Sequence, residues 1–369
     1  MRLQLISALA VATIASTAAA DGTLSMRGVY YKERATRVIQ PMMDGSFDAG
    51  TNGLVTAHFL VDAITSASAS SGAENSTPFT ENRVEGGAGY THEIDRFRLS
   101  GEAKYSTESD YRSVFVGVRA EVDLAQKNTV LGLGGGYSAD KISAASDQGG
   151  LAQPTIMCSA TETATDCSLG TLIGFASASQ ILSKNLVVGA TLDVSRLDGY
   201  QANPYRTAIT DMGEANERHP TLRTREAAAV SVRYFIPQSQ TTLIGAYRYY
   251  RDTWKVHAHT PEVRIVQQVG FAADASLRYR YHSQDGAFFY RDRYMTGEGV
   301  DGYVTDDVKL DSFTGHTFEA KLGILGETFG MKDRWSGARF EGILSYVLQH
   351  PRFGNAITAQ LALTVPFEY

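Results

Sequence analysis

Charged and imidazole side chains gather in two neighbouring segments of the second half of the sequence. His257 and His259 stand shortly before Glu262, and Arg278 and Arg280 alternate with tyrosines in the segment that follows. In an extended strand, residues two positions apart point to the same side. The two histidines therefore share a face, beside Glu262, and the two arginines share a face. Carboxylates, imidazoles and guanidinium groups held together can form charge-assisted hydrogen bonds with each other or with a charged solute.

Other chemistries fit these residues less well. Two histidines at i and i+2 with a carboxylate can bind a transition metal, but polar wall residues bonded to neighbouring Arg or Asp are the simpler interpretation. The run from Gly132 to Gly136 resembles a phosphate loop, yet it lies in an alternating segment with no helix after it, which favours close strand packing. Nothing in the sequence has the local signature of a Ser, His and acid triad. We therefore assign no catalytic residue, no metal and no cofactor, and we do not predict an enzyme.

The elements that position these side chains follow a period of two, which is clearest at the C-terminal end. There the apolar set alternates with a polar one, and it comprises Ile357, Ala359, Leu361, Leu363, Val365, Phe367 and Tyr369. A terminal aromatic residue on the apolar face is typical of the closing strand of a bacterial outer-membrane barrel. We therefore interpret Phe367 and Tyr369 as an assembly signal read by the barrel assembly machinery. The formal net charge of −6 argues against nucleic-acid binding.

The same alternation recurs along the chain, with no composition break that would separate domains. It predicts an all-β fold, a transmembrane antiparallel β-barrel of about 16 strands. The strands are expected near residues 23–33, 36–47, 53–65, 80–92, 96–107, 111–124, 128–141, 168–181, 185–197, 222–236, 240–251, 255–267, 274–284, 315–328, 337–349 and 356–369. Fourteen is the alternative, because Pro41 and Asp44-Gly45 interrupt the second segment.

The connections alternate between short polar turns and long loops, the latter at about 65–80, 142–168, 197–221 and 284–314. Outer-membrane barrels have short periplasmic turns and long external loops, so both termini are expected on the periplasmic side. The Asp-rich loop from Gln284 to Phe313 is expected to be a solvated external loop. The alternatives for it are divalent-cation binding or inward folding as a constriction.

The N-terminal segment and the cysteines agree with export. Residues 1–20 combine Arg2, an apolar stretch and Ala18-Ala19-Ala20, which predicts a signal peptide, and residues 21–369 form the outer-membrane barrel. The closely spaced pair Cys158 and Cys167 is expected to form a disulfide in an external loop. A metal pair is the weaker alternative, because no histidine stands nearby.

Several motifs resemble a domain-of-unknown-function family of predicted bacterial outer-membrane β-barrel proteins. The motifs are Val29-Tyr30-Tyr31-Lys32-Glu33, Val61-Asp62-Ala63-Ile64-Thr65-Ser66-Ala67-Ser68, Asp252-Thr253-Trp254, His259-Thr260-Pro261-Glu262, and Arg278-Tyr279-Arg280-Tyr281 followed by Gln284, Ala287, Phe289 and Tyr290. The resemblance implies a barrel in the outer membrane and covers most of the chain after residue 20. It implies no established activity, so no functional residue is carried over from it.

In such a barrel we predict one functional centre, a charged cluster on the inner wall near the external end. Its members, the lumen or constriction candidates, are Asp62, His257, His259, Glu262, Arg278 and Arg280. Asp62 comes from the third strand and would have to reach the others across the lumen. The function this favours is a porin-like channel for small polar solutes or ions. The alternatives are a structural or partner-binding barrel whose lumen is closed by its own side chains or by a periplasmic or lipoprotein partner, and an outer-membrane hydrolase with a nucleophile near His257 or His259. Beyond these, the expected partners are outer-membrane lipids.

Overall fold

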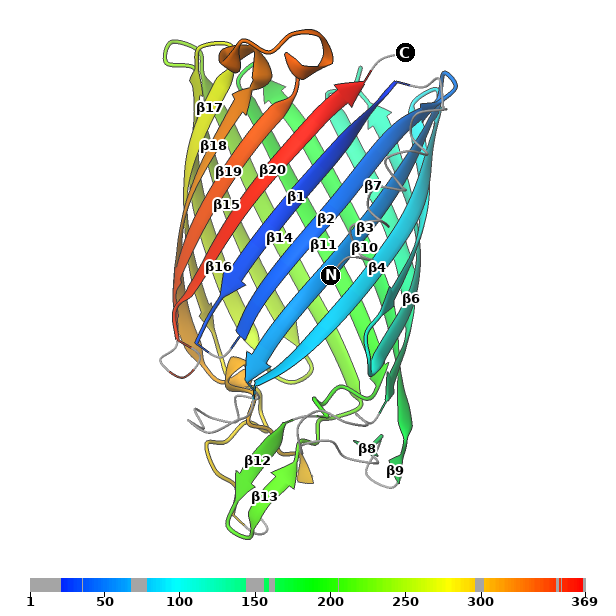
Figure 1. Cartoon of the computed structure of the whole chain (residues 1–369), viewed down its shortest axis with the longest axis vertical. Helices are drawn as coiled ribbons and strands as arrows, with labels where there is room; N and C mark the ends of the chain where they lie inside the picture. The colour runs from blue at the N-terminus through cyan, green and yellow to red at the C-terminus, as the bar shows by residue number, and fades with distance from the viewer. Residues whose placement is uncertain are drawn as a thin grey trace.

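The described residues form one closed antiparallel barrel of sixteen strands (Figure 1). The computed structural model describes residues 21–34, 36–67, 78–143, 156–158, 163–204, 206–295, 302–349, 352 and 354–367. Each strand pairs with its neighbours along the chain, and β1 pairs with β20 to close the sheet. The barrel strands are β1 (Gly22–Lys32), β2 (Thr36–Ala49), β3 (Gly53–Ala67), β4 (Pro78–Ile94), β5 (Phe97–Thr107), β6 (Tyr111–Leu124), β7 (Thr129–Ser143), β10 (Asp166–Ser183), β11 (Leu186–Gly199), β14 (Leu222–Ile236), β15 (Thr241–Asp252), β16 (His257–Val269), β17 (Ala273–Gln284), β18 (Phe313–Leu325), β19 (Arg339–Leu348) and β20 (Ala356–Phe367).

The two ends of the barrel differ, as the sequence predicts. Figure 1 shows the start of β1 and the end of β20 at one end, and the small hairpins β8–β9 and β12–β13 beyond the other. β8 spans Ile156–Met157, β9 Thr163–Ala164, β12 Thr207–Thr210 and β13 Gly213–Asn216. These hairpins were not expected inside the long loops. We call the end that carries them the external end, and the opposite end periplasmic, because outer-membrane barrels have their short turns there.

The period of two places apolar side chains on the outside of the barrel. On β6, Val114, Val116 and Val118 are exposed on the outer surface, as are Leu131 and Leu133 on β7. Between them, polar side chains point inward, where the hydroxyl oxygens of Ser113 and Ser138 lie 3.0 Å apart. An outer surface of apolar side chains on a closed sheet is suited to lipid, because every strand pairs on both sides and no edge remains.

The glycine-rich segment of β7 makes room for two inward-facing aromatic rings. A Cβ atom at Gly136 would lie 2.7 Å from the ring of Phe115, and one at Gly134 would collide with the ring of Phe175. These glycines therefore let the rings of Phe115 and Phe175 lie flat against the inner wall. This agrees with the interpretation of the segment as closely packed strand rather than as a phosphate loop.

The fourteen-strand alternative is wrong, because β1 and β2 are complete barrel strands. Pro41 lies opposite Gly28 of β1, and that ladder runs without a break. On the other side, the pairing with β3 skips Gln40 and Pro41, as expected of a residue without an N–H. The strand expected at 315–328 is also too long, since β18 ends at Leu325. Two 3-10 turns follow it at the periplasmic end, η4 (Gly326–Phe329) and η5 (Asp333–Trp335).

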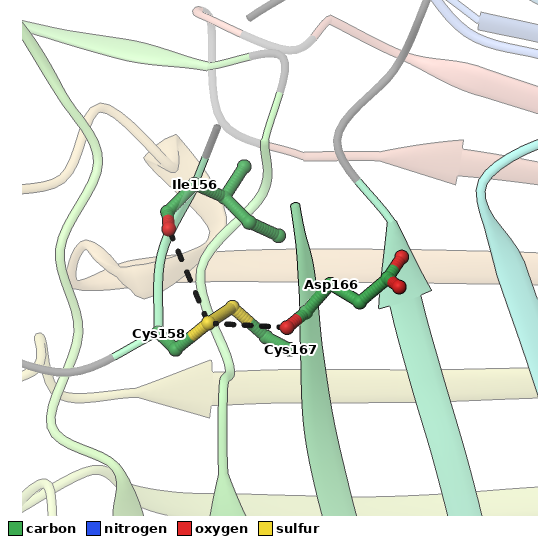
Figure 2. Close-up of a disulfide and its surroundings, with 4 residues drawn as sticks. All are labelled: Ile156, Cys158, Asp166 and Cys167. Carbon is green, nitrogen blue, oxygen red and sulfur yellow. Dashed lines mark hydrogen bonds between the residues drawn. A yellow bond between two sulfur atoms is a disulfide. The ribbon is translucent and has the colours of Figure 1, made fainter. Parts of the chain in front are cut away.

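The predicted disulfide between Cys158 and Cys167 is present, with Cα atoms 5.2 Å apart. Cys158 directly follows β8, and Cys167 is the second residue of β10. Figure 2 shows the bond between the external hairpin and the beginning of that strand, with Ile156 and Asp166 beside it. The disulfide thus fastens an external loop to the rim of the barrel, and one of its two cysteines already belongs to a barrel strand.

Candidate functional site

A cluster of paired charges on the inner wall surrounds Glu262 of β16. Its Oε2 atom accepts hydrogen bonds from Arg280, at 2.6 Å from Nη2 and 2.8 Å from Nε, and it lies 3.6 Å from Nη1 of Arg278. Its Oε1 atom lies 3.4 Å from Nη2 of Arg264. Arg278 also pairs with Glu319 of β18, and the hydroxyl of Ser345 donates to Glu319 at 2.9 Å. We call Glu262, Arg264, Arg278, Arg280 and Glu319 the wall patch.

Strand register brings the members of the wall patch together. Glu262 lies directly opposite Arg280, and Arg264 opposite Arg278, in the β16–β17 ladder. Arg278 in turn lies opposite Glu319 in the β17–β18 ladder. The facing pairs Glu262–Arg280 and Arg278–Glu319 carry opposite charges and stabilise the pairing, and partial burial in the wall strengthens their hydrogen bonds. Arg264 and Arg278 are like charges that face each other, and the carboxylate of Glu262 lies near both and offsets their repulsion.

The two histidines lie on the other side of the wall, which corrects the prediction for them. Val263 and Ile265 are on the outer surface of β16, and His259 is on their side by strand alternation. Its Nδ1 atom lies 2.5 Å from the hydroxyl of Tyr247, another outer-surface residue. His257, at the start of β16, is 3.5 Å from Asp285. An odd number of positions separates both histidines from Glu262, so one strand cannot point all three inward.

Asp62 points inward but belongs to a different part of the wall. It is only 2% exposed, and its Oδ2 atom lies 2.5 Å from Nη2 of Arg83 on the adjacent strand β4. It therefore does not reach across the lumen to the wall patch. Of the six predicted residues, the structure brings together Glu262, Arg278 and Arg280.

Two of the long external loops pack into a compact structure. L5 is the connection at residues 200–221, and L7 is the connection at residues 285–312. An antiparallel bridge joins Arg218 of L5 to Val304 of L7, and a parallel one joins Thr210 to Tyr294. We call the described parts of L5 and L7 the loop cap. The loop at 284–313 is external, as expected, but its described part packs against L5 and is only partly solvated.

An aromatic core holds the loop cap against the rim of the barrel. Phe289 of L7 is 1% exposed, and its ring lies 5.1 Å from that of Trp254, in the turn between β15 and β16. The ring of His219 lies 5.2 Å from Trp254 and 5.4 Å from Phe289. Burying aromatic rings contributes several kcal/mol, and truncating one to Ala typically costs about 3–5 kcal/mol. The sequence hints at this core only through the aromatic run that ends in Phe289 and Tyr290.

A buried carboxylate connects the two loops of the cap. The hydroxyl of Thr305 in L7 donates to Glu217 of L5 at 2.5 Å, and Nη1 of Arg206 lies 3.5 Å from the same carboxylate oxygen. Arg206 also lies 3.0 Å from Asp307. Burial by itself would raise the pKa of Glu217, but nearby His219, Arg206 and Thr305 lower it to about 2. Glu217 is therefore charged at neutral pH.

L7 spans a wide part of the external mouth. Lys309 lies 3.3 Å from Glu33, which follows β1, and Arg352, which precedes β20, lies 2.8 Å from Asp292. With the contacts to L5, these pairs connect L7 to several separate points of the rim. A solute entering from the external end therefore meets the cap before the wall patch.

The described residues offer no ready metal site or helical span. Within the described ranges, no three His, Cys, Asp or Glu side chains are grouped as a metal ion would need. No helix among these residues is long and apolar enough to cross a membrane.

Comparisons with other proteins identify a family and a fold. Residues 71–341 match the family described as "Protein of unknown function (DUF3570)". Comparison with curated proteins gives no match. Among solved structures, a bacterial polysaccharide outer-membrane secretin superposes with a TM-score of 0.51 at 9% identity, covering 94% of this chain and 98% of that one. The BenF-like porin of Pseudomonas fluorescens Pf-5 gives 0.48 at 9% identity, covering 95% and 99%, and Pseudomonas aeruginosa OccD3 (OpdP) gives 0.49 at 8%, covering 94% and 91%. The chain has the fold of an outer-membrane β-barrel.

Proposed function

The chain belongs to the DUF3570 family, and from this premise and the geometry of its barrel we propose a porin-like outer-membrane channel for small polar solutes or ions. Its lipid environment follows from the apolar outer surface of a closed sheet. A barrel of sixteen strands is wide enough to enclose an aqueous channel.

The observation that carries the proposal is the solvent exposure of charged side chains that point into the barrel. The side chain of Arg280 is 42% exposed and that of Arg119 on β6 is 46% exposed. Both alternate with outward-facing apolar residues, so their exposed surface faces the lumen. Guanidinium groups keep this much contact with water only where side chains do not fill the space in front of them.

The charges in this wall favour weak selectivity. In the wall patch, three arginines stand beside two glutamates. Near the periplasmic end, Arg339 pairs with Glu341 at 2.9 Å and also with Asp274. A wall of mixed sign passes ions of both signs, whereas a strongly selective pore needs rings of one sign.

A capped barrel that binds a partner is the second candidate, and the loop cap favours it. If L5 and L7 close the external mouth completely, the same wall would enclose a sealed lumen. A periplasmic or lipoprotein partner would then be the functional contact. In either case we infer that the barrel assembly machinery recognises the closing strand by its apolar aromatic end. In the folded barrel the ring of Phe367 packs on Phe47 beside the β1–β20 seam, 5.7 Å between centroids.

Conductance separates the two candidates. Purified, folded barrel is added to planar bilayers, and the current is recorded in KCl; the same preparation after heat unfolding is the control. The channel predicts stepwise insertion events of uniform conductance. A folded barrel, shown by its heat-modifiable migration on a gel, that inserts without conducting would refute the channel and favour the capped, partner-binding barrel.

A further inference from the structure

A cavity of about 380 Å³ opens at the external mouth between the barrel rim and the loop cap. Its lining comes from L5, from Asp307 of L7, from the external ends of β6, β7 and β10, and from L3, the short connection at residues 108–110 between β5 and β6. We propose that this cavity binds alkylammonium groups, that is, primary amines on a hydrocarbon stem, before the solute enters the barrel. The role of this cavity in solute entry rests on the proposed channel, whereas the binding itself does not.

The first support is a buried carboxylate without a counterion. Asp110 lines the cavity and is only 7% exposed, and its carboxylate makes no hydrogen bond or ion pair with any described residue. The neighbouring Glu108 lies 4.0 Å from Nε of Arg83, which pairs more closely with Asp62. An unpaired buried charge is unfavourable, and a cation placed beside it offsets that cost.

A second acceptor in the cavity also lacks a donor. The side-chain amide of Gln201 donates to the carbonyl oxygens of Pro220 and Thr221, at 3.3 and 3.0 Å. Its Oε1 atom is thereby fixed in place, buried, and without a hydrogen-bond partner among the described residues. An ammonium group has three donors and no acceptor, so it suits a lining in which Asp110 and Gln201 offer acceptors without donors.

The charge balance of the lining favours a cation over an anion. Arg206 is the only guanidinium group that lines the described part of the cavity, and it is already bound to Glu217 and Asp307. The two L3 carboxylates therefore remain in excess. Burial, and to a lesser extent the charges of Asp110 and Asp62, raise the pKa of Glu108 against the opposing effect of Arg83, as expected where negative charge is crowded.

The apolar part of the lining favours an organic cation over a metal ion. Ile142, Leu169, Tyr200 and Ala202 belong to one hydrophobic cluster and line the cavity together with Pro204. These residues offer apolar contact to a hydrocarbon stem. Metal coordination would need several His, Cys, Asp or Glu ligands in one group, and the described residues contain none.

The test uses full-length folded barrel in detergent and isothermal titration with butane-1,4-diamine, with butane-1,4-diol as the neutral probe of equal length. We expect the diamine to bind and the diol not to bind. Asp110→Asn should weaken diamine binding about tenfold or more, as loss of a charge-assisted hydrogen bond does. Asp285→Asn removes the same charge from an exposed site on the same end of the barrel, outside the cavity, and should change binding less than twofold.

Equal binding of the diol and the diamine would overturn the inference, as would an Asp110→Asn effect no larger than that of Asp285→Asn. If Asp110→Asn does not fold, Glu108→Gln takes its place with the same expectation and the same refuting outcome. A barrel that conducts but does not bind the diamine overturns this inference alone. A barrel that binds the diamine but does not conduct overturns the proposed channel and supports the cavity.

Discussion

Replacing Arg278 and Arg280 together by alanine should make the channel more selective for cations. The wall patch holds three positive side chains against two negative ones, a net of one positive charge. The double variant keeps Arg264, Glu262 and Glu319, and the net charge of the wall patch becomes one negative. Ser345 and Arg264 still contact the two glutamates, so the variant should fold, although less stably than the native barrel.

The size of the shift follows from Coulomb's law and salt screening. An ion that passes about 8 Å from a fixed charge in water interacts with it by about 0.5 kcal/mol. At 0.15 M salt that separation is about one Debye length, which reduces the interaction to roughly 0.2 kcal/mol. Removing two such positive charges lowers the electrostatic free energy of a passing cation by about 0.4 kcal/mol and raises that of an anion by as much. The cation-to-anion permeability ratio should rise about three- to fourfold at 0.15 M salt and less than about 1.5-fold at 1 M.

Reversal potentials across planar bilayers, measured in KCl gradients at both ionic strengths, give this ratio directly. Arg251→Ala is the matched control. Arg251 points away from the lumen and pairs with Glu226 on the outside of the barrel, so its charge does not face the permeation path. Arg280→Lys keeps the charge and should keep the native ratio. A folded, conducting double variant with an unchanged ratio at 0.15 M would remove both arginines from the permeation path and leave them as structural wall residues.

Three further perturbations test other parts of the molecule. Deleting Phe367 to Tyr369 removes the ring packed on Phe47 at the barrel seam, so little heat-modifiable protein should reach the outer membrane; normal levels of folded barrel would show that the closing strand has been misread. Replacing Cys158 and Cys167 by serine should speed protease cleavage of the external loop without impairing assembly, and thiol labelling of the denatured, unreduced native protein should find neither cysteine. The pKa of Glu217 is depressed to about 2, so its contribution to the loop cap is complete above the unfolded value near 4.5 and is lost as the pH falls toward 2. Fluorescence of Trp254 in a Trp335→Phe background should therefore change between pH 5 and pH 2, and an unchanged signal, or an equal change in Glu217→Gln, would contradict the role of this carboxylate.

The barrel could be predicted from the sequence because each strand carries its own signal. Alternation between apolar and polar residues needs no information from the rest of the chain, and turn residues separate one strand from the next. The pairing of Glu262 with Arg280 is harder to predict from the sequence, because alternation fixes the face of a residue but not its cross-strand neighbour. The tight turn at residues 270–272 sets that register.

The misplaced residues have two different causes. For His257 and His259 the sequence itself shows the error. Both stand an odd number of positions before Glu262, so strand alternation puts them on the opposite face. For the loop cap no local pattern exists. Glu217 and Thr305 are hydrogen-bonded although 88 positions separate them in the sequence. The cavity beside the loop cap is also lined by Asp110, which comes from a third segment. Contacts of this kind depend on tertiary packing, which propensity and periodicity do not encode.

The outward-facing histidines locate the wall patch relative to the membrane. His259 lies beside Tyr247, and on the neighbouring strands the hydroxyl of Tyr279 lies 2.9 Å from Nδ1 of His316. Such rings, apolar with a polar tip, are typical of the membrane–water interface. Tyr279 is also the residue directly before Arg280, which pairs with Glu262. The wall patch therefore lies inside the barrel at the height of the outer interface, with the loop cap beyond it. At this level the arginines point into the lumen, where an ion that permeates the proposed channel comes close to their charges. Substitutions in the wall patch are for that reason the sharper test of a channel than substitutions in the loops.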